Sequence, residues 1–290
     1  MKKNGFAPIL ILIIAVLGTA GYFAYKNQLL SAWIGKTFQA TTRSKYTFEW
    51  NDQAKTAIVF KDNSQINSFN LAEKPLDVFY YIPGNILAIV TEDKNSLQHL
   101  YIYKNGKLTK IHSGEKFAYS EDLKDLLPTR IEGEGFSPDG DYFLTNEFGW
   151  EVGAALIFST NSFKKIEGKD RWVFPFASVF WHPQNLCFLN IGTLGMYPPF
   201  NFFQVKNTTY EGMEIQGLVD DLSYDYDNNK TTVWWNDDCS GVIRLENEKG
   251  IKSFYKFDSQ GGKLQLTNKS SINKLQKSSN INQEHIYSQE

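Results

Sequence analysis

Residues 136–144 read FSPDGDYFL, and this stretch decides the fold because its pattern returns at a regular interval. WHPQNLCFL stands at 181–189 and YDNNKTTVW at 226–234, so each copy starts 45 residues after the one before. Every copy combines an aromatic residue, a tight turn and the beginning of a strand. Weaker copies begin at Trp50 and Tyr81. A period of roughly 45 residues is the length of one four-stranded blade of a β-propeller.

The turn inside the repeat has a clear chemistry. Pro138 presets the backbone angle that starts a tight turn, and Gly140 supplies the positive φ that ends it. In the second copy His182 takes the place that Ser137 has in the first. We therefore expect His182 to be a turn residue.

Short strands and hairpins fill the rest of the body. Runs rich in β-branched and aromatic residues lie at 56–60, 87–91, 100–103, 155–159, 202–205, 231–235 and 242–245. Hairpin turns of the type that Asn, Asp and Gly favour are expected at 62–63, 105–106, 160–161, 207 and 249–250. This spacing predicts an all-β fold. Five turns and five hairpins predict a propeller of about five blades over 46–267, with a β-sandwich as the alternative.

The element at 136–144 resembles the FSPDG element of the TolB-type and WD40-like propeller repeat. The resemblance is good at 136–160 and fair at 181–206. It implies blades packed side by side through their aromatic residues. Propellers host many functions, so the resemblance by itself implies only a binding or scaffolding role.

The N-terminus carries an uncharged apolar stretch at residues 6–25. Twenty helical residues cover roughly 30 Å, the thickness of the hydrocarbon core of a bilayer. Lys2 and Lys3 precede the stretch, which favours a cytoplasmic N-terminus and an extracytoplasmic body. We expect a retained signal anchor, because the apolar run continues to Phe23.

Two other interpretations of this stretch stay open. The small residues at 18–20 permit cleavage by signal peptidase after Ala20. The junction at Gly5 and Phe6 resembles that of type IV pilins, which would make the chain a pilin-like assembly subunit. Pilins have a Glu at the fifth mature position, where this chain has Leu10.

These patterns divide the chain into four parts. Residues 1–26 are the predicted transmembrane anchor, and 27–45 form a juxtamembrane helix or linker. Residues 46–267 form the propeller-like domain. The tail at 268–290 is rich in Asn, Ser, Lys and Gln, so we expect it to be disordered, with a final strand that completes the first blade as the alternative.

Composition limits the partners. The chain has 290 residues, with 30 Lys and Arg against 32 Asp and Glu, for a formal net charge of -2. A nucleic-acid partner is excluded on this balance, since such binding relies on Lys and Arg contacts with phosphates. The expected partners are the membrane, through residues 6–25, and a protein or glycan of the cell envelope.

Two polar groupings are candidate sites. Asp225, Asp227 and Asn229 have the spacing of the first half of a calcium loop, so calcium is the one candidate cofactor. Cys187 and Cys239 fall in neighbouring predicted blades. Cysteines of an exported chain are able to pair, so a disulfide between them is a candidate cross-link.

Enzymatic activity is the less favoured interpretation. The chain has no GxSxG element, phosphate loop or dinucleotide fingerprint. Five-bladed propellers include glycoside hydrolases, which pair two carboxylates. Glu132, Glu134, Glu147 and Glu151 are the carboxylates available here. We therefore expect a non-enzymatic binding or scaffolding module, with a cell-surface glycan-processing hydrolase as the alternative.

Overall fold

The computed structural model is an all-β protein whose compact unit spans Tyr46–Glu290. It describes residues 45–117, 127–149, 153–168, 178–191, 200–206, 209–216, 231–246, 249–260, 262–278 and 283–288. The predicted span at 6–25 and the predicted linker at 27–44 lie outside these residues. Within the described ranges, no helix is long and apolar enough to cross a membrane.

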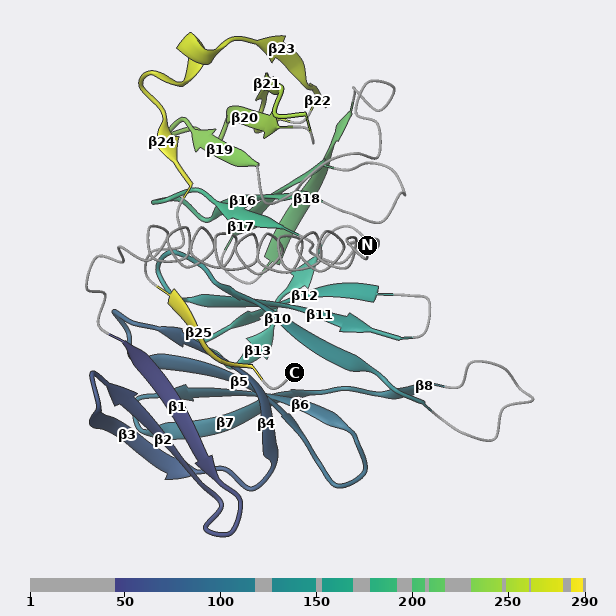
Figure 1. Cartoon of the computed structure of the whole chain (residues 1–290). Helices are drawn as coiled ribbons and strands as arrows, with labels where there is room; N and C mark the ends of the chain where they lie inside the picture. Colours follow the sequence, from purple (N-terminus) through teal and green to yellow (C-terminus); the bar gives the residue numbers. More distant parts are fainter. Residues whose placement is uncertain are drawn as a thin grey trace, which may run out of the picture. The chain divides into compact units, whose positions relative to one another are not determined.

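The first two sheets are formed by consecutive strands of the chain, except that the second also contains a strand from the C-terminus (Figure 1). Sheet 1 contains β1 (Tyr46–Asn51), β2 (Thr56–Lys61) and β3 (Ser64–Asn70). Sheet 2 contains β4 (Lys74–Tyr81), β5 (Ile86–Glu92), β6 (Gln98–Lys104), β7 (Lys107–Ser113) and the C-terminal strand β25 (Gln283–Ser288). All pairings in these two sheets are antiparallel. A separate two-stranded ladder joins β8 (Lys116–Phe117) to β9 (Leu127–Pro128).

Three further sheets follow in chain order. Sheet 3 contains β10 (Arg130–Phe136), β11 (Tyr142–Phe148), β12 (Gly153–Ser159) and β13 (Lys164–Lys165). Sheet 4 contains β14 (Glu167–Gly168), β15 (Val179–Trp181), β16 (Cys187–Ile191), β17 (Phe200–Lys206), β18 (Thr209–Gln216) and, paired with β18, β22 (Gly262–Lys263). Sheet 5 contains β19 (Thr232–Trp235), β20 (Gly241–Glu246), β21 (Lys252–Phe257), β23 (Gln265–Thr267) and β24 (Gln276–Lys277). The short helix η2 (Lys269–Ile272) lies between β23 and β24.

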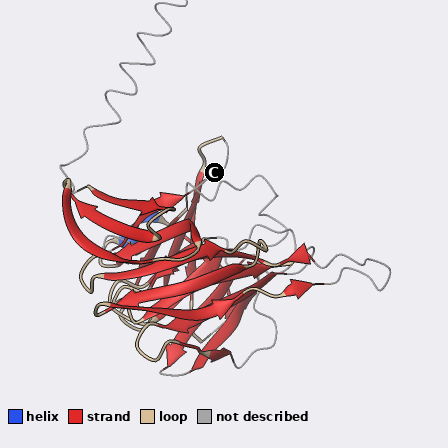
Figure 2. Cartoon of the chain, turned by 90° about the horizontal axis from the view of Figure 1, so that it is seen from below, coloured by secondary structure: helices blue, strands red, loops and turns tan. Residues whose placement is uncertain are grey.

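Consecutive sheets pack against each other through apolar side chains. A cluster with Phe48, Val59, Val78 and Leu87 joins sheets 1 and 2, and one with Leu100 and Phe143 joins sheets 2 and 3. Clusters around Trp181 and Phe203, and around Phe202 and Trp235, then join sheets 3 and 4 and sheets 4 and 5. Figure 2 shows the strands in stacked layers. None of the described sheets closes on itself, so the fold is all-β with several sheets, consistent with either a propeller or a sandwich.

The turns follow the chemistry expected from the sequence. Asp62 and Asn63 both have positive φ, at 49° and 67°, as a primed turn between β2 and β3 requires. Asn105 and Gly106, at 53° and 76°, do the same between β6 and β7. Gly140 has a φ of +75°, and an added Cβ there would collide with the ring of Tyr81. These two hairpins confirm the turns predicted at 62–63 and 105–106, whereas the turn predicted at 207 lies outside the described residues.

In each of the five sheets, the first strand of at least three residues in chain order lies at one edge of the sheet or next to that edge. We call the line of strands β1, β4 with β25, β10, β15 and β24 the first-strand edge. In sheet 2 β25 is added outside β4, and in sheet 5 β24 is added outside β19. Only five residues lie between Lys277 of β24 and Gln283 of β25, so the chain between them spans at most about 22 Å even when fully extended. The first-strand edges of sheets 5 and 2 therefore lie near each other.

The C-terminal tail differs from the expectation of disorder. Of residues 268–290, the described ones form η2, β24 and β25, and the two strands pair with β19 and β4. Both strands lie at sheet edges, where backbone pairing holds them, and Ile286 and Tyr287 of β25 also pack as partly buried side chains against the cluster that joins sheets 1 and 2. A polar composition therefore did not distinguish an edge strand from a disordered segment.

Candidate functional site

The structure describes the predicted disulfide but not the residues of the predicted calcium site. Asp225, Asp227 and Asn229 lie outside the described residues. Among the residues that are described, no three His, Cys, Asp or Glu side chains are grouped to hold a metal ion. Cys187 and Cys239 are joined as a disulfide, with their Cα atoms 6.3 Å apart.

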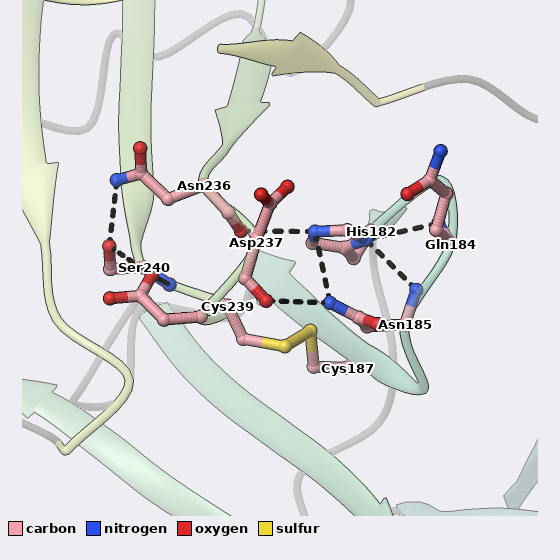
Figure 3. The surroundings of a disulfide bond; sticks show 9 residues. His182, Gln184, Asn185, Cys187, Asn236, Asp237, Cys239 and Ser240 are labelled. Carbon is pink, nitrogen blue, oxygen red and sulfur yellow. Dashed lines mark hydrogen bonds between the residues drawn. A yellow bond between two sulfur atoms is a disulfide. The ribbon is translucent and has the colours of Figure 1, made fainter.

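The disulfide links sheets 4 and 5 (Figure 3). Cys187 is the first residue of β16 and is fully buried, and Cys239 lies in the turn between β19 and β20 with a φ of +67°. This turn is closed by hydrogen bonds from Ser240 N to Asp238 Oδ1 and from Cys239 N to Asn236 O. The bond therefore fixes an otherwise polar turn to the apolar interface of two sheets.

His182 lies beside the disulfide and is also fully buried (Figure 3). Its Nδ1 accepts hydrogen bonds from the backbone N–H groups of Gln184 and Asn185, at 3.0 and 2.9 Å. The proton of the neutral ring is therefore on Nε2, which donates to the carbonyl of Asn236 at 3.0 Å. Burial lowers the pKa of His182, against the opposing effect of Asn236. His182 is thus the predicted turn residue, and in addition it connects two sheets.

Glu134 occupies the β-bulge of β10 on the first-strand edge. The β10–β11 register shifts between Gly133 and Gly135, and a bulge re-aims the side chain that it carries. The carboxylate accepts a hydrogen bond from Asn146 Nδ2 at 2.7 Å. Burial, followed by the nearby charge of Glu132, raises the pKa of Glu134 to about 8. A carboxyl that carries a proton at neutral pH therefore lies beside a second carboxylate.

We expect Glu134→Gln to stabilise the protein at pH 8 and to leave its stability at pH 4 unchanged. The raised pKa makes the contribution of Glu134 fully present below pH 4.5 and progressively lost as the pH rises through about 8. The expected gain is about 3 kcal/mol in the free energy of unfolding, measured by urea titration at both pH values. Glu132→Gln is the matched control. Because the side chain of Glu132 is more exposed, we expect this substitution to change the free energy of unfolding by only about 0.5 kcal/mol. Equal stability of wild type and Glu134→Gln at pH 8 would contradict the buried acid.

Glu147 is paired rather than free to act as an acid or base. His112 Nε2 lies 2.9 Å from one of its carboxylate oxygens, and Thr129 donates to the other. Burial works to raise the pKa of Glu147, but the hydrogen bonds from His112 and Thr129 outweigh it and hold the pKa below its usual value. The pair joins β7 to β11 and thus ties sheet 2 to sheet 3. Glu151, the fourth candidate carboxylate, lies outside the described residues.

Sequence reasoning missed a polar network at one end of sheet 2. Glu73 accepts hydrogen bonds from Thr91, Tyr101 and Lys110, and these hold its pKa below the usual value although burial opposes them. Its carboxylate also lies 3.8 Å from Nε2 of the buried His99. These residues come from the start of β4 and from three neighbouring strands, so no local motif marks them.

The described C-terminal residues, 276–278 and 283–288, contact the first-strand edge of all five sheets. β24 pairs with β19 of sheet 5, and Ser278 Oγ donates to the carbonyl of Trp181 of sheet 4 at 2.6 Å. Gln283 Oε1 accepts the N–H of Phe136 of sheet 3. β25 pairs with β4 of sheet 2 and also contacts β1 of sheet 1. This edge is the candidate binding site.

No known sequence family and no curated protein matches the chain. Solved structures similar to it include a protein of unknown function from Desulfotomaculum acetoxidans, hydrazine synthase from Kuenenia stuttgartiensis and TolB from Acinetobacter baumannii. Their sequence identities are 9%, 13% and 11%, and their TM-scores are 0.38, 0.39 and 0.31. The matches cover 78%, 81% and 77% of this chain. The chain in turn spans 65%, 70% and 57% of the length of those proteins.

Proposed function

We propose that the chain is a membrane-tethered, extracytoplasmic β-propeller of five blades that acts as a binding or scaffolding module at the cell envelope. The apolar stretch at 6–25 supports the tether, and Lys2 and Lys3 support the orientation. The five sheets follow one another in chain order with an apolar cluster between each consecutive pair, as blades do. The described C-terminal residues contact the same edge of every sheet, which is expected if the sheets are blades arranged around a common axis.

The disulfide is the observation that carries the extracytoplasmic location. Cys187 and Cys239 are the two cysteines of the chain, and they pair with each other across 52 residues of sequence. Disulfides form and persist in oxidising compartments, whereas the cytosol keeps thiols reduced. A body folded around this bond fits a location outside the cytoplasm.

The test compares the full chain with a variant in which two charges interrupt the span. In a bacterial host, the cysteines of the full chain are expected to resist alkylation by maleimide until a reductant is added, and protease added to intact cells should digest the body. The matched control is Leu12→Arg with Val16→Arg, because charges at the centre of the span oppose insertion. This variant should keep alkylatable thiols and stay protected from protease. Reactive thiols or full protection in the wild-type chain would refute the proposal.

A glycan hydrolase remains a second candidate because of the protonated Glu134. Glycoside hydrolysis uses one carboxyl as the acid and a second carboxylate as base or nucleophile, and Glu132 lies two residues away on the same strand. The substrate would be a glycan of the cell surface. The Glu134→Gln variant distinguishes the two functions, because it should abolish hydrolysis of cell-wall glycans while leaving the fold intact. Absence of hydrolysis by the wild-type chain would remove this candidate.

A further inference from the structure

We propose that strand β3 of sheet 1 pairs with β3 of a second copy of this chain, so that two chains form a two-fold symmetric dimer. We call the strand of each sheet that lies opposite the first-strand edge its outer-edge strand. The outer-edge strands of sheets 1 to 5 are β3, β7, β13, β14 and β23. The inference goes beyond the proposed function, because self-association does not depend on where the chain is located.

The backbone of β3 is free on its outer side. Sheet 1 ends at β3 after three strands, whereas each of sheets 2 to 5 has at least four (Figure 1). Within the part of the chain that the structure describes, residues 64–70 pair with β2, and their backbone groups form no hydrogen bond with any other strand. Five of the seven side chains of β3 are exposed. The outward N–H and C=O groups of β3 are therefore a template for a further strand.

β3 lacks the protection that the other outer-edge strands have. β7 carries the exposed Lys107 and Lys110, and β13 consists of the exposed Lys164 and Lys165. β14 and β23 are only two and three residues long. Lysine side chains and short length are two means by which proteins keep edge strands from pairing. β3, by contrast, is seven residues long and carries no charge.

A second copy is the partner that this strand fits. In a two-fold symmetric antiparallel pair, each strand meets a strand of the same sequence, so a charged residue lies close to its own copy. Self-pairing of β7 or β13 would therefore bring lysines together. Self-pairing of β3 brings together only Ser, Gln, Ile, Asn and Phe side chains. An uncharged strand also has nothing that selects a charged partner over its own copy.

Ile66 supplies the apolar contact of the proposed dimer. The β2–β3 ladder shifts register between Gln65 and Asn67, so Ile66 has no partner on β2, and its side chain is 38% exposed. Antiparallel pairing centred on Asn67 would place Ile66 of each copy beside Ser68 of the other and cover it. The opposite edge strand of sheet 1, β1, contacts β25, so β3 is the edge that sheet 1 offers and pairing closes at two chains.

The test compares the full chain, purified in a mild non-ionic detergent, with Ile66→Lys by sedimentation velocity over a wide range of protein concentration. We expect the wild type to dimerise as its concentration rises, with slower hydrogen exchange at residues 64–70 in the dimer. Ile66→Lys places like charges on both pairing strands, so the Kd of the dimer should rise about tenfold. Leu266→Lys is the matched control, because it adds the same charge at an exposed side chain of another outer-edge strand and should leave the Kd unchanged.

A charge exchange shows whether the two copies meet at this edge. Ile66→Glu alone should weaken the dimer as Ile66→Lys does, whereas an equal mixture of the two variants should dimerise about as well as the wild type. Three outcomes would overturn the proposal: a wild-type chain that stays monomeric, a Kd that responds equally to Ile66→Lys and Leu266→Lys, or a mixture that dimerises no better than either variant alone. A dimer held by the apolar stretch at 6–25 would give the third outcome, because all these proteins share that stretch.

Discussion

Replacing Cys187 and Cys239 together with alanine is expected to lower the free energy of unfolding by about 4 kcal/mol. The disulfide closes a loop of 52 residues, and the chain-entropy relation for a loop of that length gives a loss of this size. The shift in Tm or a urea titration of the purified protein would measure this loss of stability. No other single feature outside the apolar clusters is expected to contribute as much.

The location of the bond adds a structural consequence. Both cysteines belong to the apolar cluster between sheets 4 and 5, although Cys239 lies in a turn whose other residues are polar. Without the bond, that turn is held to sheet 4 by the hydrogen bonds of His182 and Asn185 and by the apolar cluster between the two sheets. Wild-type protein treated with a reductant is the matched control, because it loses the bond while keeping both side chains. Equal stability of oxidised and reduced wild type would contradict the prediction.

Local chemistry made the hairpins predictable. The pairs at 62–63 and 105–106 need positive φ at both positions, which Asn, Asp and Gly adopt at little cost, so the sequence marks these turns directly. The β-branched and aromatic runs likewise mark the strands between them, including β2, β5 and β20. The structure confirms the all-β fold with several mainly antiparallel sheets that these local signals predicted.

Contacts between distant residues could not be predicted in the same way. β25 pairs with β4, about 200 residues earlier in the chain, and this pairing depends on backbone groups that every residue carries. From the sequence, Glu132 and Glu134 are two alternating acids of an exposed strand face. The bulge in β10 and the hydrogen bond from Asn146, which place Glu134 in a more buried position, are not visible in the sequence. The Cys187–Cys239 disulfide was partly predictable. The 45-residue repeat predicts that the two cysteines lie in neighbouring sheets, but it does not predict the distance between them.

His182→Ala is expected to lower the free energy of unfolding by about 3 kcal/mol. The substitution removes three hydrogen bonds worth about 1 kcal/mol each, those from the N–H groups of Gln184 and Asn185 and that to the carbonyl of Asn236, which then keeps only the N–H of Cys239. His182→Asn is the matched control, because its Oδ1 occupies the place of Nδ1 and keeps both N–H groups satisfied. Only the bond to Asn236 is lost in that variant, so a cost of about 1 kcal/mol is expected.

A comparison of wild type with His182→Asn also tests the pH dependence of the connection between sheets 4 and 5. A proton added to Nδ1 would face two N–H donors, so the folded state disfavours the charged ring, and burial lowers the pKa further. The stabilising contribution is therefore fully present above pH 6.5 and is lost as the pH falls below 6.5 through the folded pKa. Urea titrations from pH 7.5 to about 5 should show wild type losing stability relative to His182→Asn. If the difference between the two proteins stayed constant over this range, the pKa of the ring would be the same in the folded and the unfolded chain, and the assigned direction of the two Nδ1 hydrogen bonds would be wrong.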